Sequence, residues 1–167
     1  MSRRVALWIA FVVVHLGVAA LGFAEPNMPM GDVYIVYEPW SSSALGGDGI
    51  VGVTESWVYP ALALVPMVLT HAFAWLGGYT VGWALFVTGC NALAFWMLVG
   101  SGRSMGRTIA AWFWLGFIAL LGPVGMYRID AVTVPIAIAG CLWLFGRPRL
   151  AAALFTIGAW IKVWPAA

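Results

Sequence analysis

The chain has 167 residues, of which 63% are hydrophobic and only 8% are charged, and its formal net charge is +2. Because a water-facing surface of this size needs far more charge, the composition excludes a soluble globular domain. It predicts an all-α, polytopic membrane bundle that forms a single membrane domain over residues 1–167. The eight basic residues are scattered and form no stripe, which excludes nucleic acid as a partner.

The first apolar run, residues 5–24, has about the 20 residues that cross a bilayer. Arg3 and Arg4 precede it, which predicts a cytoplasmic amino end. The alternative is a signal peptide cleaved after Gly22–Ala24, but the run is longer than the core of an ordinary signal peptide. His15 lies within this run and is expected to bond to a neighbouring helix.

A long connection over residues 25–78 follows, and loops longer than about 12–15 residues are commonly functional. It holds five of the six acids and no Lys or Arg, the acids being Glu25, Asp32, Glu38, Asp48 and Glu55. Their irregular spacing resembles no oxygen-ligand loop, so no metal ion is expected. No glycine-rich phosphate loop follows a strand, and no cofactor is expected either.

Asp32 stands out among these acids because it follows the first run by only a few residues, which predicts a position at the membrane–water boundary. A carboxylate placed there is suited to take a proton from an acceptor hydroxyl, as a general base. The alternative is that Asp32 caps a short interfacial helix.

Further apolar runs lie at residues 59–76, 79–100, 108–123, 131–145 and 150–164. If all crossed the membrane, the arginines of two short loops would face outside, against the preference for cytoplasmic arginine. The run at 59–76 opens on Tyr59-Pro60 and contains Pro66, so it is expected to lie in the interface. The sequence therefore predicts about five transmembrane helices, plus one interfacial helix in an outer loop at 25–78.

Arg128 and Lys162 are the basic residues expected in the outer half of the bundle, where a charge near a helix centre costs roughly 2.5–3.5 kcal/mol. An anionic partner is therefore expected: either Asp130 or the phosphate of a lipid substrate. Asp130 lies only two residues from Arg128, and such residues do not face each other on a helix. The alternative is that both cations reach up to lipid headgroups.

Two cysteines, Cys90 and Cys141, lie inside apolar runs and have no His or second Cys at metal-ligand spacing. They are expected to be free thiols packed in the core.

Four short segments stand out when they are taken together: Gly31–Tyr37, Val58–Ala63, Tyr127–Asp130 and Ile161–Pro165. Together they resemble glycosyltransferase family 87, the polyprenol-phosphate-mannose-dependent mannosyltransferases with the C-type glycosyltransferase fold. Gly31–Tyr37 looks like the aspartate motif of that family, and Val58–Ala63 like its Tyr-Pro-Pro-Leu-Ala segment. Tyr127–Asp130 stands where the family has Gly-Gln-x-Asn, and Ile161–Pro165 is similar to its Ile-Lys-x-x-Pro ending. Two departures are Ala61, in place of the second proline, and the Arg-Ile-Asp turn itself.

The resemblance implies an inverting transferase in which Asp32 is the general base. The polyprenyl-phosphate sugar donor and a glycan or glycolipid acceptor are then the expected partners. Arg128 and Lys162 are expected to stabilise the leaving phosphate, with Asp130 beside them. Tyr34, Tyr37 and Tyr59 are candidates for stacking on sugar rings, and the alternative for them is interfacial anchoring.

The expected location is the plasma (cell inner) membrane, with the loop at 25–78 extracytoplasmic. The likeness covers the amino-terminal two-fifths of a typical family member, so the chain is expected to be truncated. Two alternatives stay open: half of a lipid or solute transporter, and a non-catalytic membrane scaffold. Matched interrupted helices, typical of inverted-repeat transporters, are not visible in the sequence.

Overall fold

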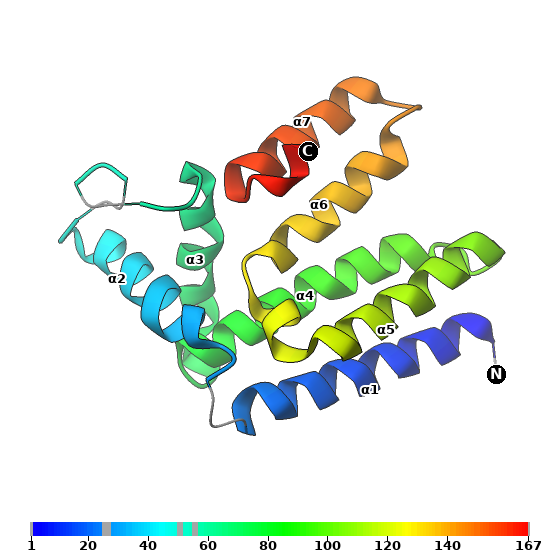
Figure 1. Ribbon diagram of the computed structural model, residues 1–167, viewed down its shortest axis with the longest axis horizontal. Helices are drawn as coiled ribbons and strands as arrows, with labels where there is room; N and C mark the ends of the chain where they lie inside the picture. The colour runs from blue at the N-terminus through cyan, green and yellow to red at the C-terminus, as the bar shows by residue number, and fades with distance from the viewer. Residues whose placement is uncertain (1, 25–27, 50–51, 55–56, 167) are drawn as a thin grey trace.

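The structure is a computed structural model that describes residues 2–24, 28–49, 52–54 and 57–166. Within these ranges every regular element is a helix, which confirms the predicted all-α class. The bundle consists of α1 (Arg3–Ala24), α4 (Tyr79–Val99), α5 (Met105–Tyr127), α6 (Asp130–Trp143) and α7 (Pro148–Ile161). These helices run back and forth, so that successive members begin at opposite ends of the bundle (Figure 1).

Three of these helices, α1, α4 and α5, are long and apolar enough to cross a membrane, with 22, 21 and 23 residues. They mark the chain as a membrane protein. The helices α6 and α7 have 14 residues each. At a rise of 1.5 Å per residue each is about 21 Å long, shorter than the roughly 30 Å of a hydrocarbon core.

Helix α5 is kinked near its carboxyl end. Gly122 has φ 60° and ψ −150°, a backbone conformation that side chains rarely adopt, and Pro123 follows it without an N–H to donate. The last turn of α5, up to Tyr127, is therefore set off from the long part of the helix. The chain changes direction at this break and continues into the short turn before α6.

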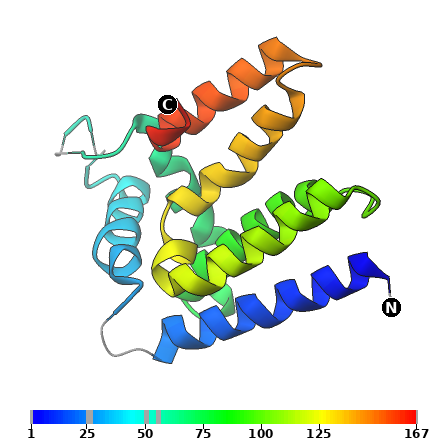
Figure 2. The same ribbon diagram turned by 45° about the vertical axis from the view of Figure 1, so that its right-hand side comes forward.

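Short helical segments cover one end of the bundle. A π-helix, η1 (Val33–Tyr37), leads into α2 (Glu38–Gly46), and later come η2 (Ala61–Ala63), α3 (Leu64–Thr70) and η3 (His71–Leu76). The run expected as one helix is helical without interruption from Ala61 to Leu76, with 3-10 turns on both sides of α3. α3 lies across the end of the bundle rather than along its helices (Figures 1 and 2). Pro66 is in the first turn of α3, where a backbone N–H has no helical partner.

The two ends of the bundle carry opposite charge. The first, named here the arginine end, holds the start of α1 and the α4–α5 and α6–α7 connections, with Arg3, Arg4, Arg103, Arg107, Arg147 and Arg149. The second, the aspartate end, carries all the acids that the structure describes: Asp32, Glu38, Asp48 and Asp130. Glu25 and Glu55 lie outside the described residues. Figure 1 shows both ends side-on.

The expectation for His15 is wrong, and the expectation for the two cysteines is confirmed only in part. His15 Nδ1 lies 2.9 Å from the carbonyl oxygen of Phe11 in its own helix, and its ring stacks on Phe11 at 3.8 Å, instead of bonding to a neighbouring helix. This is possible because residues four apart lie on one helix face. Both cysteines are free, but only Cys90 packs against the core, whereas Cys141 is exposed on the surface of α6.

Candidate functional site

Two ion pairs at the aspartate end join segments that are distant in sequence. Arg128 Nε lies 3.5 Å from Asp32 Oδ2, and Lys162 Nζ lies 3.7 Å from Asp130 Oδ2. Arg128 and Asp130, two residues apart, therefore do not pair with each other, and each finds a partner on another element. Among the described residues these are the ion pairs that the structure contains, so acids and cations gather at one place.

Asp32 immediately precedes η1, where its backbone is already helical, with φ −58° and ψ −31°. Its side chain makes no capping hydrogen bond, which speaks against the alternative that it is a helix cap. The side chain is 39% exposed, so the carboxylate can be reached from outside while it faces Arg128.

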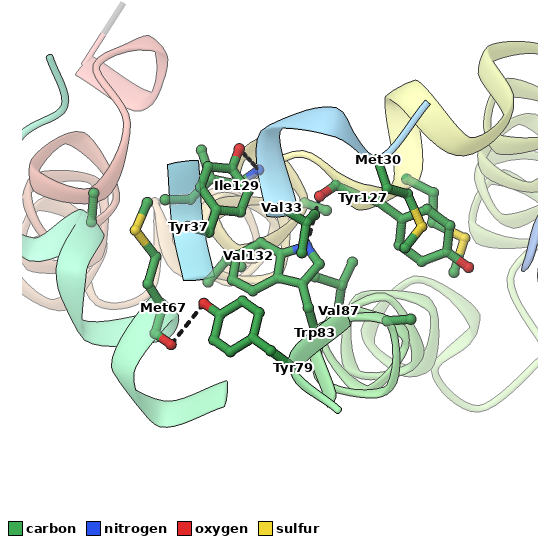
Figure 3. Close-up of a cluster of buried hydrophobic side chains, with 14 of the residues drawn as sticks. Met30, Val33, Tyr37, Met67, Tyr79, Trp83, Val87, Tyr127, Ile129 and Val132 are labelled. Carbon is green, nitrogen blue, oxygen red and sulfur yellow. Dashed lines mark hydrogen bonds between the residues drawn. The ribbon is translucent and has the colours of Figure 1, made fainter. Parts of the chain in front are cut away.

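Arg128 stands in the turn between α5 and α6. Both of its neighbours, Tyr127 and Ile129, are anchored (Figure 3). The indole Nε1–H of Trp83 donates to the carbonyl oxygen of Tyr127 at 2.7 Å. On the other side, the backbone N–H of Ile129 donates to the hydroxyl oxygen of Tyr37 at 3.2 Å. The Arg128 side chain is 57% exposed. A fixed backbone thus presents a guanidinium that a ligand can reach.

Lys162 comes directly after α7, where the helix ends and the backbone becomes extended. Its Nζ lies 4.7 Å from the centre of the Tyr59 ring, close enough for a cation–π contact as well as the ion pair to Asp130. The segment before η2 therefore meets the end of α7, and the cation is held between a carboxylate and an aromatic face.

The three candidate tyrosines have different surroundings. Tyr59 is half-buried beside the rings of Trp40 and Trp57, at centroid distances of 6.3 and 6.1 Å. Tyr34 is 37% exposed. Tyr37 is fully buried at 0% exposure, so the expectation that its ring stacks on a sugar is wrong. Burial also raises the pKa of its phenol far above the usual value of 10.0, which keeps it neutral.

An apolar pocket opens beside the ion pairs. The α5–α6 pocket, of about 510 Å³, is lined by the charged residues Arg128 and Asp130 together with apolar residues that include Trp114, Phe117 and Leu121. It adjoins a second pocket of about 380 Å³ with which it shares Trp114, Val134 and Trp164. Phe117 and Leu121 are more than 40% exposed, so the wall lies on the outer surface of the bundle.

The sequence analysis did not single out this pocket wall. Trp114, Phe117 and Leu121 follow a spacing of three and four residues, which places them on one face of α5. In an apolar run this spacing does not mark one face of the helix, because the residues on the other faces are hydrophobic as well. The signal was therefore present but could not be separated from ordinary lipid-facing side chains.

A buried polar contact joins two of the covering helices. Ser41 Oγ lies 2.8 Å from His71 Nε2, and the His71 ring packs on Tyr79 at 4.8 Å. Ser41 also donates to the carbonyl oxygen of Tyr37 at 2.6 Å. Ser41 is 0% exposed, so this pair locks α2 against α3 and η3 rather than facing a ligand.

The part of the chain that the structure describes contains no group of three His, Cys, Asp or Glu side chains that would hold a metal ion. Comparisons with protein-family models, with curated proteins and with solved structures find no match to this chain. The functional assignment therefore rests on the site itself: two carboxylates, two cations and an aromatic ring beside an apolar pocket.

Proposed function

We propose that the chain is part of an integral membrane glycosyltransferase. It transfers a hexose, with mannose as the expected sugar, from a polyprenyl-phosphate donor to a glycan or glycolipid of the cell envelope. Asp32 is the general base, and Arg128 with Lys162 binds the phosphate that leaves.

The observation that carries this proposal is the position of Asp32 beside Arg128, which is one of the residues that line the α5–α6 pocket. A polyprenyl phosphate is an anion attached to a long apolar chain, and its sugar is attached at the phosphate. A guanidinium at the mouth of an apolar pocket matches the first two parts. A carboxylate next to that guanidinium is placed to act where the sugar must lie.

The proposed reaction is one inverting displacement. The oxygen of the acceptor hydroxyl forms a bond to the anomeric carbon while its proton passes to the Asp32 carboxylate. The bond between the anomeric carbon and the phosphate oxygen breaks, and polyprenyl phosphate leaves with the electron pair. Negative charge grows on the phosphate as this happens, and the positive charges of Arg128 and Lys162 stabilise it. Tyr59 and the exposed Tyr34 supply aromatic faces for the sugar.

A donor phosphate must compete with Asp32 and Asp130 for the two cations. Both side chains of the Asp32–Arg128 pair are well exposed, and exposed pairs contribute only about 0–1 kcal/mol. A phosphate bound by Arg128 can therefore displace Asp32 at little cost. In this scheme donor binding frees the carboxylate that the next step requires, and the same exchange applies to Asp130 and Lys162.

We further infer that five helices cross the membrane, with local thinning of the bilayer accommodating the shorter α6 and α7. We also infer that α3 and η3 lie in the interface, and that the aspartate end faces the outside of the plasma (inner) membrane. Six arginines lie at the opposite end of the bundle. Their position supports this orientation, because short arginine-rich loops stay in the cytoplasm. The five tyrosines of the chain also lie toward the aspartate end, where amphipathic rings prefer the interface.

The proposal is tested with the full-length protein and labelled polyprenyl-phosphate mannose. Wild type transfers the label, Asp32→Asn loses transfer by about 100-fold or more, and Asp48→Asn, an exposed aspartate of the same region, keeps it. Retained transfer in Asp32→Asn excludes the assigned base. Failure of wild type with every acceptor favours a transporter or a scaffold.

A further inference from the structure

Another pocket lies at the arginine end of the bundle, which is the end opposite Asp32. The α4–α6 pocket has a volume of about 710 Å³, and its wall is largely apolar, with Trp96, Ala139 and Trp143 among the lining residues. Two cations, Arg4 and Arg107, complete the lining. The pocket therefore combines an apolar interior with positive charge, and none of its lining residues takes part in the proposed transfer.

Arg107 is held in a fixed position beside this pocket. Its Nη2 donates to the carbonyl oxygen of Met97 at 2.6 Å, which orients the guanidinium. Gly100 makes room for it, because a Cβ at that position would clash with Arg107 Nη1. A guanidinium has five N–H donors in a planar fork. With the side chain fixed through Nη2, the remaining donors are available to an anion.

The positive charge at this end has no acidic counterpart among the described residues. The arginine end consists of arginines that precede or begin α1, α5 and α7, and none of these three helices has an acidic residue in its first turn. The amino end of a helix is the positive end of its dipole, where cations are disfavoured and anions are stabilised. Both ion pairs lie at the other end. An external anion would therefore relieve this accumulation of charge.

We propose that the α4–α6 pocket binds an anionic diacyl phospholipid, with its phosphodiester on Arg4 and Arg107 and an acyl chain among Trp96, Ala139 and Trp143. Basic pockets between transmembrane helices are typical sites for anionic headgroups. Arg4 also lines a separate apolar pocket, of about 620 Å³, whose lining residues all belong to α1. A phosphate at Arg4 thus has an apolar surface on either side for its two chains. This site is independent of the proposed transferase activity.

The test is native mass spectrometry of the delipidated protein in neutral detergent, titrated with phosphatidylglycerol or phosphatidylcholine. Wild type retains one phosphatidylglycerol and binds phosphatidylcholine at least tenfold more weakly. Arg4→Gln combined with Arg107→Gln lowers the affinity for phosphatidylglycerol at least tenfold. The matched control, Arg147→Gln with Arg149→Gln, removes the same charge from the same end but does not line the pocket, so it binds as wild type does.

The apolar part of the site has its own variant. Ala139→Leu narrows the pocket without changing a charge and is expected to weaken phosphatidylglycerol binding, while glycerol phosphate does not compete at equal concentration. The arginine variants decide the question alone if Ala139→Leu proves unstable. Any of three results overturns the proposal. These are an equal loss of phosphatidylglycerol affinity in the pocket and control variants, full competition by glycerol phosphate, and no retained lipid of either kind.

Discussion

The hydroxyl oxygen of Tyr37 accepts a hydrogen bond of 3.2 Å from the backbone N–H of Ile129, 92 residues further along the chain. This contact ties η1, which follows Asp32, to the turn that carries Arg128. The buried phenol of Tyr37 therefore holds Asp32, the proposed base, close to Arg128, the residue proposed to bind the phosphate. Tyr37 is a positioning residue, although its sequence context suggested a sugar contact.

Replacing Tyr37 by Phe leaves the buried N–H of Ile129 without an acceptor, and an unsatisfied buried donor costs about 1–3 kcal/mol. We expect Tyr37→Phe to lower stability by that amount in thermal unfolding, and to slow mannose transfer because Arg128 is no longer held beside Asp32. Tyr34→Phe is the matched control, since Tyr34 is 37% exposed, and its effect should stay within about 0.5 kcal/mol. Equal effects of both variants would contradict the positioning role.

The buried phenol also predicts a pH dependence. Because burial raises the pKa of Tyr37 in the folded protein above its usual value of 10.0, the unfolded chain loses this proton first as pH rises. The contribution of Tyr37 to the free energy of unfolding is therefore fully present below pH 10. It decreases above pH 10, with a slope that approaches about 1.4 kcal/mol per pH unit. Unfolding measured at pH 9 to 11 should show a smaller decline in Tyr37→Phe than in wild type. Parallel declines would show that Tyr37 does not contribute.

The close packing of α1 on the end of α5 is tested by two glycines of the same helix. A Cβ at Gly22 would lie 2.9 Å from Cε2 of the buried Tyr127 ring, whereas nothing lies within 4 Å of a Cβ at Gly17. Gly22→Ala should destabilise the protein by about 1–3 kcal/mol through overpacking. Gly17→Ala should be neutral or stabilising by up to about 1 kcal/mol. The difference between their unfolding temperatures is the readout, and the reverse order would show that this contact is absent.

Membrane topology is tested by single cysteines at two exposed serines, Ser42 in α2 and Ser104 before α5. After Cys90→Ala and Cys141→Ala remove the native thiols, Ser42→Cys should react with an impermeant maleimide on intact cells. Ser104→Cys should react only after the membrane is opened. Labelling of both, or of Ser104→Cys alone, would reject the proposed orientation.

Hydrophobicity and arginine position predicted much of the fold. The five long runs correspond to α1, α4, α5, α6 and α7 because an apolar run between charged or glycine-rich breaks has few alternatives to a helix. The apolar run at 108–123 ended close to the kink at Gly122, but the sequence did not show that the helix resumes after the kink and continues to Tyr127. Nor did it show that 3-10 turns precede and follow α3 within the run at 59–76.

The charges of the site were predicted better than its aromatic residues. Scarcity of charge made Asp32, Arg128, Asp130 and Lys162 conspicuous, and the structure brings all four to the aspartate end in two pairs. Which acid pairs with which cation depends on long-range packing and could not be read from spacing. Aromatic residues are abundant throughout, so composition could not separate the buried Tyr37 from Tyr59, whose ring contacts Lys162.

The most direct measurement is binding of polyprenyl-phosphate mannose to Asp32→Asn and Arg128→Gln, followed by transfer from the bound donor. The account predicts that Asp32→Asn binds donor at least as tightly as wild type, because Arg128 loses its competing carboxylate, yet transfers at least about 100-fold more slowly. Arg128→Gln should bind donor at least tenfold more weakly. Transfer at the wild-type rate from donor bound to Asp32→Asn would contradict the central claim.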